Sequence, residues 1–348
     1  MKIKAISLVS GGLDSTLATK VVLEQGVDVI AANFVSPFCR CDKGRSHARS
    51  AGGPKEGEGG CRHEAKFVSE QLGIPLKIVN VTKDFLEVLK SPKHGYGSHI
   101  NPCIDCRILM LKKARQLMDE LGAKFLITGE VLGQRPMSQR RDAMHIIERE
   151  AGVKGLVLRP LSAQLLEPTL AETEGWVDRQ KLLNICGRSR KPQMKLAEDY
   201  HIKDYPCPAG GCLLTDPAFS LRIKDLIDHD ELTMEDIQLL NHGRYFRLSG
   251  KTKLVVGKNQ HENEGLESLV APGDYLFYPA HDDAGASGLG RGDFSRDDMV
   301  RLAAGITARY FDAARNSGEV AVSIKRGPEV QTLTVTPLPD EETKKYLI

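Results

Sequence analysis

Residues able to hold a phosphate gather near the start of the chain. Residues 10–16, Ser-Gly-Gly-Leu-Asp-Ser-Thr, follow an apolar run at 4–9 and precede a segment with helical spacing at 17–23. A strand, a tight turn and a helix in this order point backbone N–H groups and the positive end of a helix at an anion. The two glycines let the backbone approach a phosphate because they carry no Cβ, and Asp14 is suited to capping the helix or holding Mg²⁺. The run predicts a nucleotide phosphate site.

The turn lacks the lysine of the G-x-x-x-x-G-K-[ST] loop, so it is a different motif. It resembles the S-G-G-x-D-S loop of the PP-loop ATP pyrophosphatases, with matches at Ser10, Gly11, Gly12, Asp14 and Ser15. The resemblance implies that ATP binds over this loop and the adjoining Thr16, with Mg²⁺ near Asp14. It also implies an adenine nucleotide alpha hydrolase-like fold and an enzyme that converts ATP to AMP and pyrophosphate.

Four of the eight cysteines form a second candidate site. Cys103 and Cys106 form a C-x-x-C at the expected start of a helix, and Cys207 and Cys212 lie in a turn rich in proline and glycine. A C-x-x-C at a helix start lowers the thiol pKa and suits a metal, a cluster or a redox pair. The alternatives are Zn²⁺ bound by all four cysteines, or thiols without chemistry.

A third stretch narrows the resemblance to enzymes that put sulfur into tRNA. Thr-Gly-Glu-Val-Leu-Gly-Gln at 128–134, Ser-Gln at 138–139 and Leu-Arg-Pro-Leu at 158–161 resemble segments of the tRNA 4-thiouridine synthetases. Asn-Pro before Cys103 resembles the same place in the tRNA 2-thiouridylases. The resemblance covers about residues 1–215 and adds Gln134 to the ATP site. It implies an ATP-dependent tRNA sulfurtransferase that adenylates a uridine carbonyl and gives 4-thiouridine rather than 2-thiouridine.

Several tRNA thiolation enzymes of this kind bind a [4Fe–4S] cluster through three cysteines. Carried over, the ligands are Cys103, Cys106 and either Cys207 or Cys212, with Cys207 favoured, and the catalytic residues are Asp14, Cys106 and Cys207. Three ligands leave one iron open to hydrosulfide. The rival mechanism uses a persulfide on Cys106, with sulfur derived from a cysteine desulfurase. Against it, we expect no rhodanese-type domain at the end of the chain and no RNA-binding region before the loop.

Strands and helices alternate through the first 200 residues. Strands are expected at 4–9, 27–35, 75–81, 124–128 and 156–158, and later helices at 178–185 and 195–200. This pattern predicts an α/β fold, a doubly wound parallel sheet with helices on both faces. Ligands in such folds bind beyond the carboxyl ends of the strands, where Ser10, Phe34 and Gly129 should meet.

Residues 36–63 interrupt the pattern with glycine and charge, which predicts a mobile loop. Cys39, Cys41, Cys61 and His63 in this loop suit a Zn²⁺ knuckle, and free loop cysteines are the other interpretation. Cys186 is expected to be an ordinary buried thiol in a helix.

The composition changes near residue 217, which predicts domains at 1–216 and 217–348. From residue 243 the second is β-rich, a predicted α+β domain with a glycine-rich loop at 285–292. The stretch from Gly243 to Glu264 resembles the RNA-binding domain of the NFACT proteins, with a β-rich dimerisation or packing domain as the alternative. If the domain binds tRNA, Lys253, Lys258 and Arg247 are candidates for phosphate contacts, together with a separate basic cluster of Arg135, Arg140 and Arg141.

The composition is that of a globular protein, with 41% hydrophobic and 27% charged residues. No run is long enough to span a membrane and no signal peptide is evident, so we expect a cytoplasmic protein with reduced cysteines. Other hypotheses are a PP-loop ligase or amidotransferase acting on a small metabolite, and a non-catalytic nucleotide-binding RNA adaptor. No pattern indicates the oligomeric state.

Overall fold

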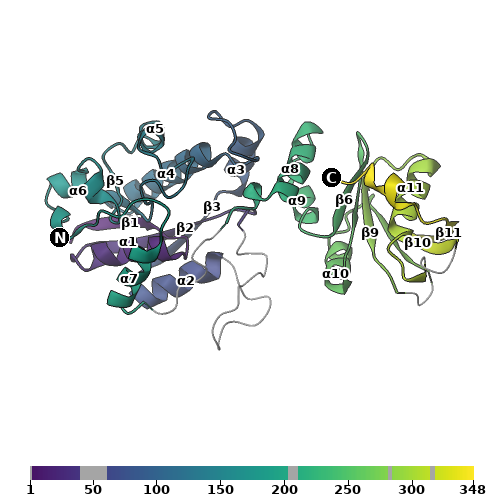
Figure 1. Cartoon of the computed structure of the whole chain (residues 1–348), viewed down its shortest axis with the longest axis horizontal. Coiled ribbons are helices and arrows are strands. Elements are labelled where there is room, and N and C mark those ends of the chain that lie inside the picture. Colours follow the sequence, from purple (N-terminus) through teal and green to yellow (C-terminus); the bar gives the residue numbers. More distant parts are fainter. Residues whose placement is uncertain (1, 40–60, 203–210, 281–283, 314–317) are drawn as a thin grey trace. The chain divides into compact units, whose positions relative to one another are not determined.

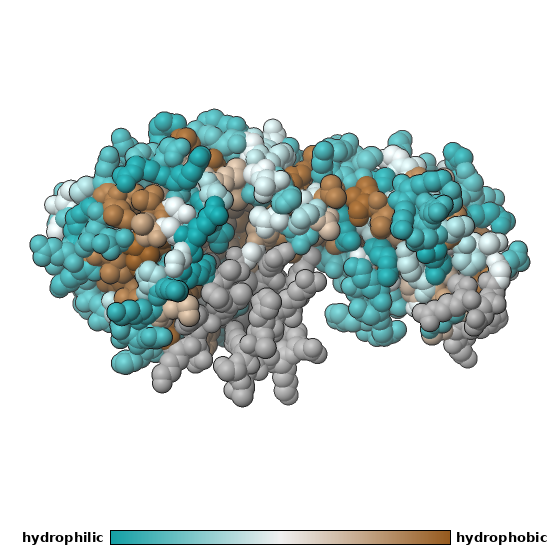
Figure 2. Space-filling view, in the orientation of Figure 1, coloured by the Kyte–Doolittle hydropathy of each residue, from teal (hydrophilic) through white to brown (hydrophobic). Residues whose placement is uncertain are grey.

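The structure is a computed structural model that describes residues 2–39, 61–202, 211–280, 284–313 and 318–348, with 61–63 described by their backbone alone. Contacts divide the chain into two compact units, Met1–Thr215 and Asp216–Ile348. Figure 1 labels their helices and strands. On the face shown in Figure 2, hydrophilic residues predominate and hydrophobic residues form smaller patches. No helix in the described part of the chain is long and apolar enough to cross a membrane.

The first unit is built on a five-stranded parallel sheet, as the alternating pattern predicts. Its strand order is β3-β2-β1-β4-β5, and every neighbouring pair is parallel. The strands are β1 (Lys4–Leu8), β2 (Asp28–Val35), β3 (Leu76–Asn80), β4 (Phe125–Thr128) and β5 (Val157–Leu158).

Helical crossovers connect these strands because parallel neighbours cannot be joined by a tight turn. The helices of this unit are α1 (Leu13–Leu23), α2 (Cys61–Leu72), α3 (Thr82–Lys90), α4 (Cys103–Glu120), α5 (Arg141–Ala151), α6 (Leu170–Thr173) and α7 (Lys191–Asp199). Sequence reasoning missed α5. The helix expected at 178–185 is wrong: only the 3-10 turn Arg179–Lys181 forms there, and an extended segment follows.

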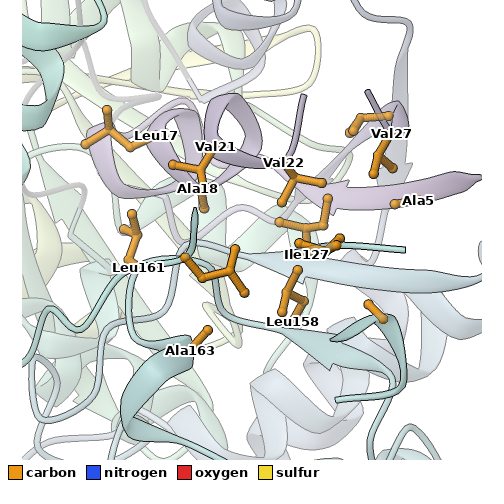
Figure 3. Close-up of a cluster of buried hydrophobic side chains, with 14 of the residues drawn as sticks. Ala5, Leu17, Ala18, Val21, Val22, Val27, Ile127, Leu158, Leu161 and Ala163 are labelled. Atoms are coloured by element: carbon orange, nitrogen blue, oxygen red, sulfur yellow. The ribbon is translucent and has the colours of Figure 1, made fainter. Parts of the chain in front are cut away.

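Hydrophobic side chains pack against both faces of the sheet. On one face, Leu17, Val21 and Val22 of α1 pack with Ile127 and Leu158 of the sheet, as Figure 3 shows. On the other face, α4 and α5 contribute a separate buried cluster that includes Leu111, Ala114 and Ile147. Because α1 follows β1 and α5 follows β4, the connections from these adjacent strands cross opposite faces, which makes the sheet doubly wound.

The second unit contains a six-stranded antiparallel sheet in the order β11-β10-β8-β9-β7-β6. The strands are β6 (Arg244–Ser249), β7 (Thr252–Val256), β8 (Tyr275–Pro279), β9 (Gly288–Gly292), β10 (Val320–Arg326) and β11 (Glu329–Val335). The helices are α8 (Pro217–Asp228), α9 (Met234–Leu239), α10 (Gln260–Ser268), α11 (Asp297–Ala308) and α12 (Asp340–Lys344). Residues of α11, including Ala303 and Ile306, share one buried cluster with Phe277 and Val322 of the sheet.

The glycine-rich stretch at 285–292, expected to be a loop, contributes strand β9. Its glycines permit close packing. A Cβ at Gly288 would lie 2.4 Å from Oγ1 of Thr307, and a Cβ at Gly290 would lie 2.6 Å from the ring of Phe294. The missing side chains allow α11 and Phe294 to pack directly on the strand, a requirement that a local reading of glycine as a loop former cannot detect.

Candidate functional site

A pocket of about 280 Å³ opens at the carboxyl ends of β1, β2 and β4. Ser10, Phe34 and Gly129 line it together, as expected from the strand ends. The pocket lies where the crossovers of β1 and β4 leave for opposite faces of the sheet, the usual ligand position in open α/β folds. Gly12, Asp14 and Ser15 also line it.

The loop after β1 is fixed by its own hydroxyl groups. The Ser15 hydroxyl donates to the Gly12 carbonyl at 2.8 Å, and the Thr16 hydroxyl donates to the same oxygen at 3.1 Å. The Ser10 and Ser15 hydroxyl oxygens are 3.3 Å apart. Gly11 has φ +80°, and a Cβ there would lie 2.5 Å from Cβ of Glu64, so only glycine fits. Because the first N–H groups of a helix have no intrahelical partner, the start of α1 supplies donors for an anion.

Gly129, directly after β4, sets how closely α1 approaches the sheet. A Cβ at this position would lie 2.4 Å from the backbone nitrogen of Ser15 and 2.6 Å from the carbonyl carbon of Asp14. Any side chain at position 129 would therefore displace the start of α1 and the loop at 10–16 with it.

Asp14 has one carboxylate oxygen in contact with protein groups and one without. Its Oδ2 accepts from Nε2 of Gln134 at 2.8 Å and lies 3.6 Å from Nη2 of Arg190. Its Oδ1 is buried and has no hydrogen-bond partner among the described residues. An unpaired buried carboxylate oxygen beside the loop at 10–16 fits a hard cation such as Mg²⁺. Arg190 was not among the residues that the sequence singled out for the ATP site.

Three cysteine side chains line this same pocket. Cys103 and Cys106 come from the start of α4, and Cys212 comes from a segment that pairs with Cys39 through an isolated β-bridge. The lowered thiol pKa expected at the helix start is wrong for Cys106: burial raises its pKa to about 12, an effect that Cys212 and Cys103 reinforce and that Arg107 and Arg135 oppose. Iron–sulfur clusters are held by thiolate sulfur, so Cys103, Cys106 and Cys212 are of the right type and line the right pocket to be cluster ligands. In the described part of the chain, no three metal-ligating side chains already form a metal-binding group.

The other predicted cysteine sites lie largely outside the described residues. Cys207 and Cys41 are in undescribed segments, as is most of the loop at 36–63, and the side chains of Cys61 and His63 are not described. Cys39 is disulfide-bonded. The disulfide contradicts both interpretations of Cys39, as a Zn²⁺ ligand and as a free loop cysteine. The third cluster ligand at Cys207 stays a prediction.

The expectation for Cys186 is wrong. This thiol is exposed and lies in a non-helical segment that bridges to Leu132. The apolar residues around Cys186 predict a helix, whereas the chain at this position is not helical.

A buried ion-pair network joins the end of β4 to the start of α4. Glu130 is 3% exposed, and its carboxylate oxygens lie 3.0 Å from Nε of Arg159 and 3.3 Å from Nε of Arg107. Although burial acts to raise the pKa of Glu130, these guanidinium groups hold it below its usual value. Arg107 follows Cys106 directly, so the network fixes the thiol-bearing turn beside the nucleotide loop.

The predicted basic cluster of the first unit divides between the pocket and the surface. Arg135 lines the pocket. Arg140 is exposed and lies 3.7 Å from Asp142, and Arg141 is exposed and donates to the Leu165 carbonyl at 2.8 Å. Their contact with RNA stays a prediction.

In the second unit, Lys253 is not placed to contact phosphate as expected. It is 3% exposed, and its Nζ lies 2.8 Å from Glu231 and 3.0 Å from Asp236. Arg247, its cross-strand neighbour, is likewise paired with Asp225 and Glu231. The strand pattern alone could not show that α8, α9 and the turn between them cover this row with acids. Lys258 is exposed and remains available.

The parallel sheet in this order, with Ser-Gly-Gly-Leu-Asp-Ser at its switch point, defines a PP-loop nucleotide-binding domain. Residues 1–165 match the family described as "Thiamine biosynthesis protein (ThiI)". Residues 243–347 match the family described as "NFACT protein RNA binding domain". The first match lies within unit Met1–Thr215 and the second within unit Asp216–Ile348.

Curated relatives resemble part of the chain. It is 26% identical over 150 residues to the tRNA-specific 2-thiouridylase MnmA of Deinococcus radiodurans, covering 41% of this chain and 37% of that protein. It is 28% identical over 158 residues to a probable tRNA sulfurtransferase of Thermococcus kodakarensis, covering 45% of this chain and 36% of that protein. The chain thus spans little more than a third of the length of these relatives. Among solved structures, a 4-thiouridine synthetase–RNA complex with bound ATP is 24% identical, with a TM-score of 0.36 and coverage of 68% of this chain and 52% of that one.

Proposed function

We propose that this protein is an ATP-dependent tRNA sulfurtransferase that replaces a uridine carbonyl oxygen with sulfur, giving 4-thiouridine. The observation that carries the proposal is that the thiols of Cys103, Cys106 and Cys212 line the same pocket as the PP-loop. A carbonyl activated at the loop would then lie within one cavity with the sulfur carrier. The match to an NFACT-type RNA-binding domain supports tRNA as the partner.

The first step activates the base. ATP lies over the loop, where the start of α1 and the hydroxyls of Ser10 and Ser15 bind its phosphates, and Asp14 would hold Mg²⁺ through its unpaired oxygen. The uracil carbonyl oxygen bonds to the α-phosphorus, the bond from that phosphorus to the αβ-bridging oxygen breaks, and pyrophosphate leaves with the electron pair. The base loses its N3 proton and carries AMP on oxygen.

The second step exchanges oxygen for sulfur. Cys103, Cys106 and a third cysteine, Cys212 or Cys207, would hold a [4Fe–4S] cluster, which supplies a position that presents hydrosulfide as a nucleophile. Sulfur bonds to the base carbon, the carbon–oxygen bond breaks, AMP leaves, and the sulfur-borne proton moves to N3. Arg107 and Glu130 keep the turn bearing Cys106 beside the loop.

The RNA must bring a single base to this pocket, since a stacked base cannot reach it. Arg135 lies at the pocket, and Arg140, Arg141 and Lys258 are exposed for phosphate contacts. The ThiI match and the 128–134 stretch favour 4-thiouridine, whereas the relatives named as 2-thiouridylases make 2-thiouridine the alternative product. With tRNA as the substrate, the proposed location is the cytoplasm.

The test begins with anaerobic purification of the full chain, with iron, sulfide and zinc analysis. We expect about four irons and four sulfides per chain, lost in Cys103→Ser, Cys106→Ser and one of Cys207→Ser or Cys212→Ser. Cys186→Ser is the matched control because its thiol is exposed and does not line the pocket. Stoichiometric zinc without visible absorbance would exclude the cluster and favour a persulfide on Cys106.

The second part of the test supplies MgATP, sulfide and unmodified tRNA, and then analyses the nucleosides. Formation of 4-thiouridine with stoichiometric AMP supports the proposal. Formation of 2-thiouridine corrects the product. Absence of AMP and of thionucleoside, with ATP and RNA still bound, would identify a non-catalytic RNA adaptor.

A further inference from the structure

The nucleotide pocket contains a buried donor without a partner as well as a buried acceptor. Nη1 of Arg190 is buried and has no hydrogen-bond partner in the described part of the chain. Oδ1 of Asp14 is the matching unpaired acceptor. The two side chains approach only through their other atoms, Nη2 and Oδ2, which are 3.6 Å apart. At this distance neither group satisfies the other, because a hydrogen bond between them would be near 2.8 Å.

Arg190 is held in place by a packed helix. It directly precedes α7, whose Ala197 is buried in the same hydrophobic cluster as Leu17 and Val21 of α1. Its side chain is 24% exposed and lines the pocket. Since burying an unpaired charged donor costs free energy, a rigid position without a tight carboxylate partner calls for an anion from outside the chain.

The amide side chains of Gln193 and Gln134 connect the same helix to Asp14. Gln193 of α7 is fully buried, and its Nε2 lies 3.4 Å from Oε1 of Gln134. Gln134 in turn donates to Oδ2 of Asp14 at 2.8 Å. The helix that follows Arg190 therefore also orients the Asp14 carboxylate. The unpaired oxygen of Asp14 and the unpaired nitrogen of Arg190 are thus both positioned by α7.

We infer that Arg190 is a catalytic residue that binds the phosphate chain of ATP and stabilises the departing pyrophosphate. The inference rests on the proposed function and adds a residue that lies beyond the ThiI match at 1–165. When the bond between the α-phosphorus and the αβ-bridging oxygen breaks, its electron pair stays on pyrophosphate, and the Nη1–H of Arg190 donates to that growing negative charge. Guanidinium is suited to this role because it stays protonated and presents a planar set of donors to phosphate.

A purely structural Arg190 would have a different signature. If it served only to hold Asp14, its loss would destabilise the chain without ligand, and a lysine would replace it only if the ion pair re-formed. If it contacts ATP, its loss leaves the stability of the free chain near that of the wild type and lowers turnover.

The experiment compares Arg190→Gln, Arg190→Lys and the control Arg188→Gln in the full chain; Arg188 is exposed and does not line the pocket. Binding of MgATP and of α,β-methylene-ATP is measured by calorimetry, tRNA-dependent pyrophosphate release by a coupled assay, and the Tm without ligand by thermal unfolding. We expect Arg190→Gln to lower kcat/KM for ATP by about 100- to 1,000-fold, with kcat reduced more than binding. Arg190→Lys should recover part of this loss, and Arg188→Gln should stay within about threefold of wild type.

The outcomes separate this inference from the proposed function. Pyrophosphate release by Arg190→Gln within about threefold of wild type would overturn the role of Arg190 while leaving the sulfurtransferase intact. If the wild type binds MgATP but does not release pyrophosphate, the proposed function fails. In that case a tenfold weaker binding of MgATP by Arg190→Gln than by Arg188→Gln supports the phosphate contact, and equal binding rejects it. A wild-type chain that binds no ATP rejects both.

Discussion

The two units each bury a group of opposite charges, and the two groups are built differently. In the second unit, Arg247, Lys253 and Arg291 are neighbours across β6, β7 and β9. Carboxylates of Asp225, Glu231, Asp236 and Asp274 face them, and each cation has a carboxylate oxygen within 3.0 Å. In the first unit, Arg190 comes no closer to Asp14 than 3.6 Å, and each keeps a buried atom without a partner.

The difference indicates what each group does. Each cation of the row in the second unit has a carboxylate partner inside the chain, so removing one should lower the free energy of unfolding. Arg190 and Asp14 in the first unit are 3.6 Å apart, so removing Arg190 should weaken ligand binding rather than lower the free energy of unfolding. Charge and burial alone do not distinguish these cases, since both groups are charged and largely buried. The distinguishing observation is the ion-pair distance. Each cation of the row has a carboxylate oxygen within 3.0 Å, although Nη1 of Arg247 has no hydrogen-bond partner in the described part of the chain, whereas Arg190 is 3.6 Å from Asp14.

The largest effect on stability is expected for Lys253→Met. The substitution keeps much of the apolar stem but leaves Glu231 and Asp236 without the ammonium that lies within 3.0 Å of both. Breaking a buried ion pair by removing one partner costs about 3 kcal/mol or more. The free energy of unfolding from urea titration measures this loss, with the exposed Lys251→Met as control. Equal stability of the two variants would show that the row is not what holds α9 to the sheet.

The next largest effect is expected for Gly129→Ala. The added methyl group would meet the backbone of Ser15 at 2.4 Å and push α1 away from β4. We expect MgATP binding to weaken by about 100-fold, or roughly 2.7 kcal/mol. Gly250→Ala is the control because a Cβ there meets nothing within 4 Å. Unchanged calorimetric affinity would mean that the loop does not bind the nucleotide.

A smaller effect, dependent on pH, is expected for Glu130→Gln. The guanidinium groups of Arg159 and Arg107 keep the folded-state pKa of Glu130 below its usual value despite burial. Its contribution to stability is therefore complete above the unfolded-state pKa of about 4.3 and is lost as the pH falls through the lower folded-state value. We expect Glu130→Gln to lose about 2 kcal/mol at pH 7 and the gap to wild type to close on acidification.

Urea titrations from pH 7 to pH 3 follow this change, with the exposed Glu167→Gln as the control. A gap that stays constant over this range would mean that Glu130 does not titrate differently in the folded and unfolded chain.

The smallest effect is expected for Lys258→Met. Lys258 is exposed, in contrast to Lys253. If it contacts phosphate, tRNA affinity falls a few-fold, stability is unchanged, and the slope of log K against log salt decreases by about one. Filter binding at several salt concentrations measures the slope. An unaltered slope would remove Lys258 from the RNA interface.

The sequence predicts the fold of the first unit better than it predicts the residues that form its pocket. The strands of the parallel sheet, the loop at 10–16 and the convergence of Ser10, Phe34 and Gly129 follow from local apolar runs and from the rule that ligands lie beyond parallel strand ends. Arg190 and Gln193 could not be identified because the tertiary packing of α7 on α1 brings Arg190 near Asp14 and Gln193 near Gln134. The excess of basic residues at 178–203 indicates a polyanionic substrate, but it does not single out Arg190 among seven Lys and Arg residues.

In the second unit, the errors have one physical cause. Lys253 and Arg247 look like surface cations of a β-rich RNA-binding domain, and 285–292 looks like a loop. Both interpretations treat the segment as if it faced solvent. The acids of α8 and α9 cover the first pair, and α11 packs on the glycines of β9. Coverage by another element is a property of the tertiary packing that composition does not encode.

The pocket is assembled from chain segments that are far apart in sequence, and this has a consequence for the order of folding. Residues 10, 34, 103, 129, 190 and 212 all contribute to its wall. Contacts of such separation close late, because each requires a long loop to be ordered first. During refolding, the parallel sheet should therefore acquire its circular dichroism before the chain can bind a fluorescent ATP analogue. During synthesis, the loop at 10–16 would wait for nearly two hundred further residues before it becomes a binding site.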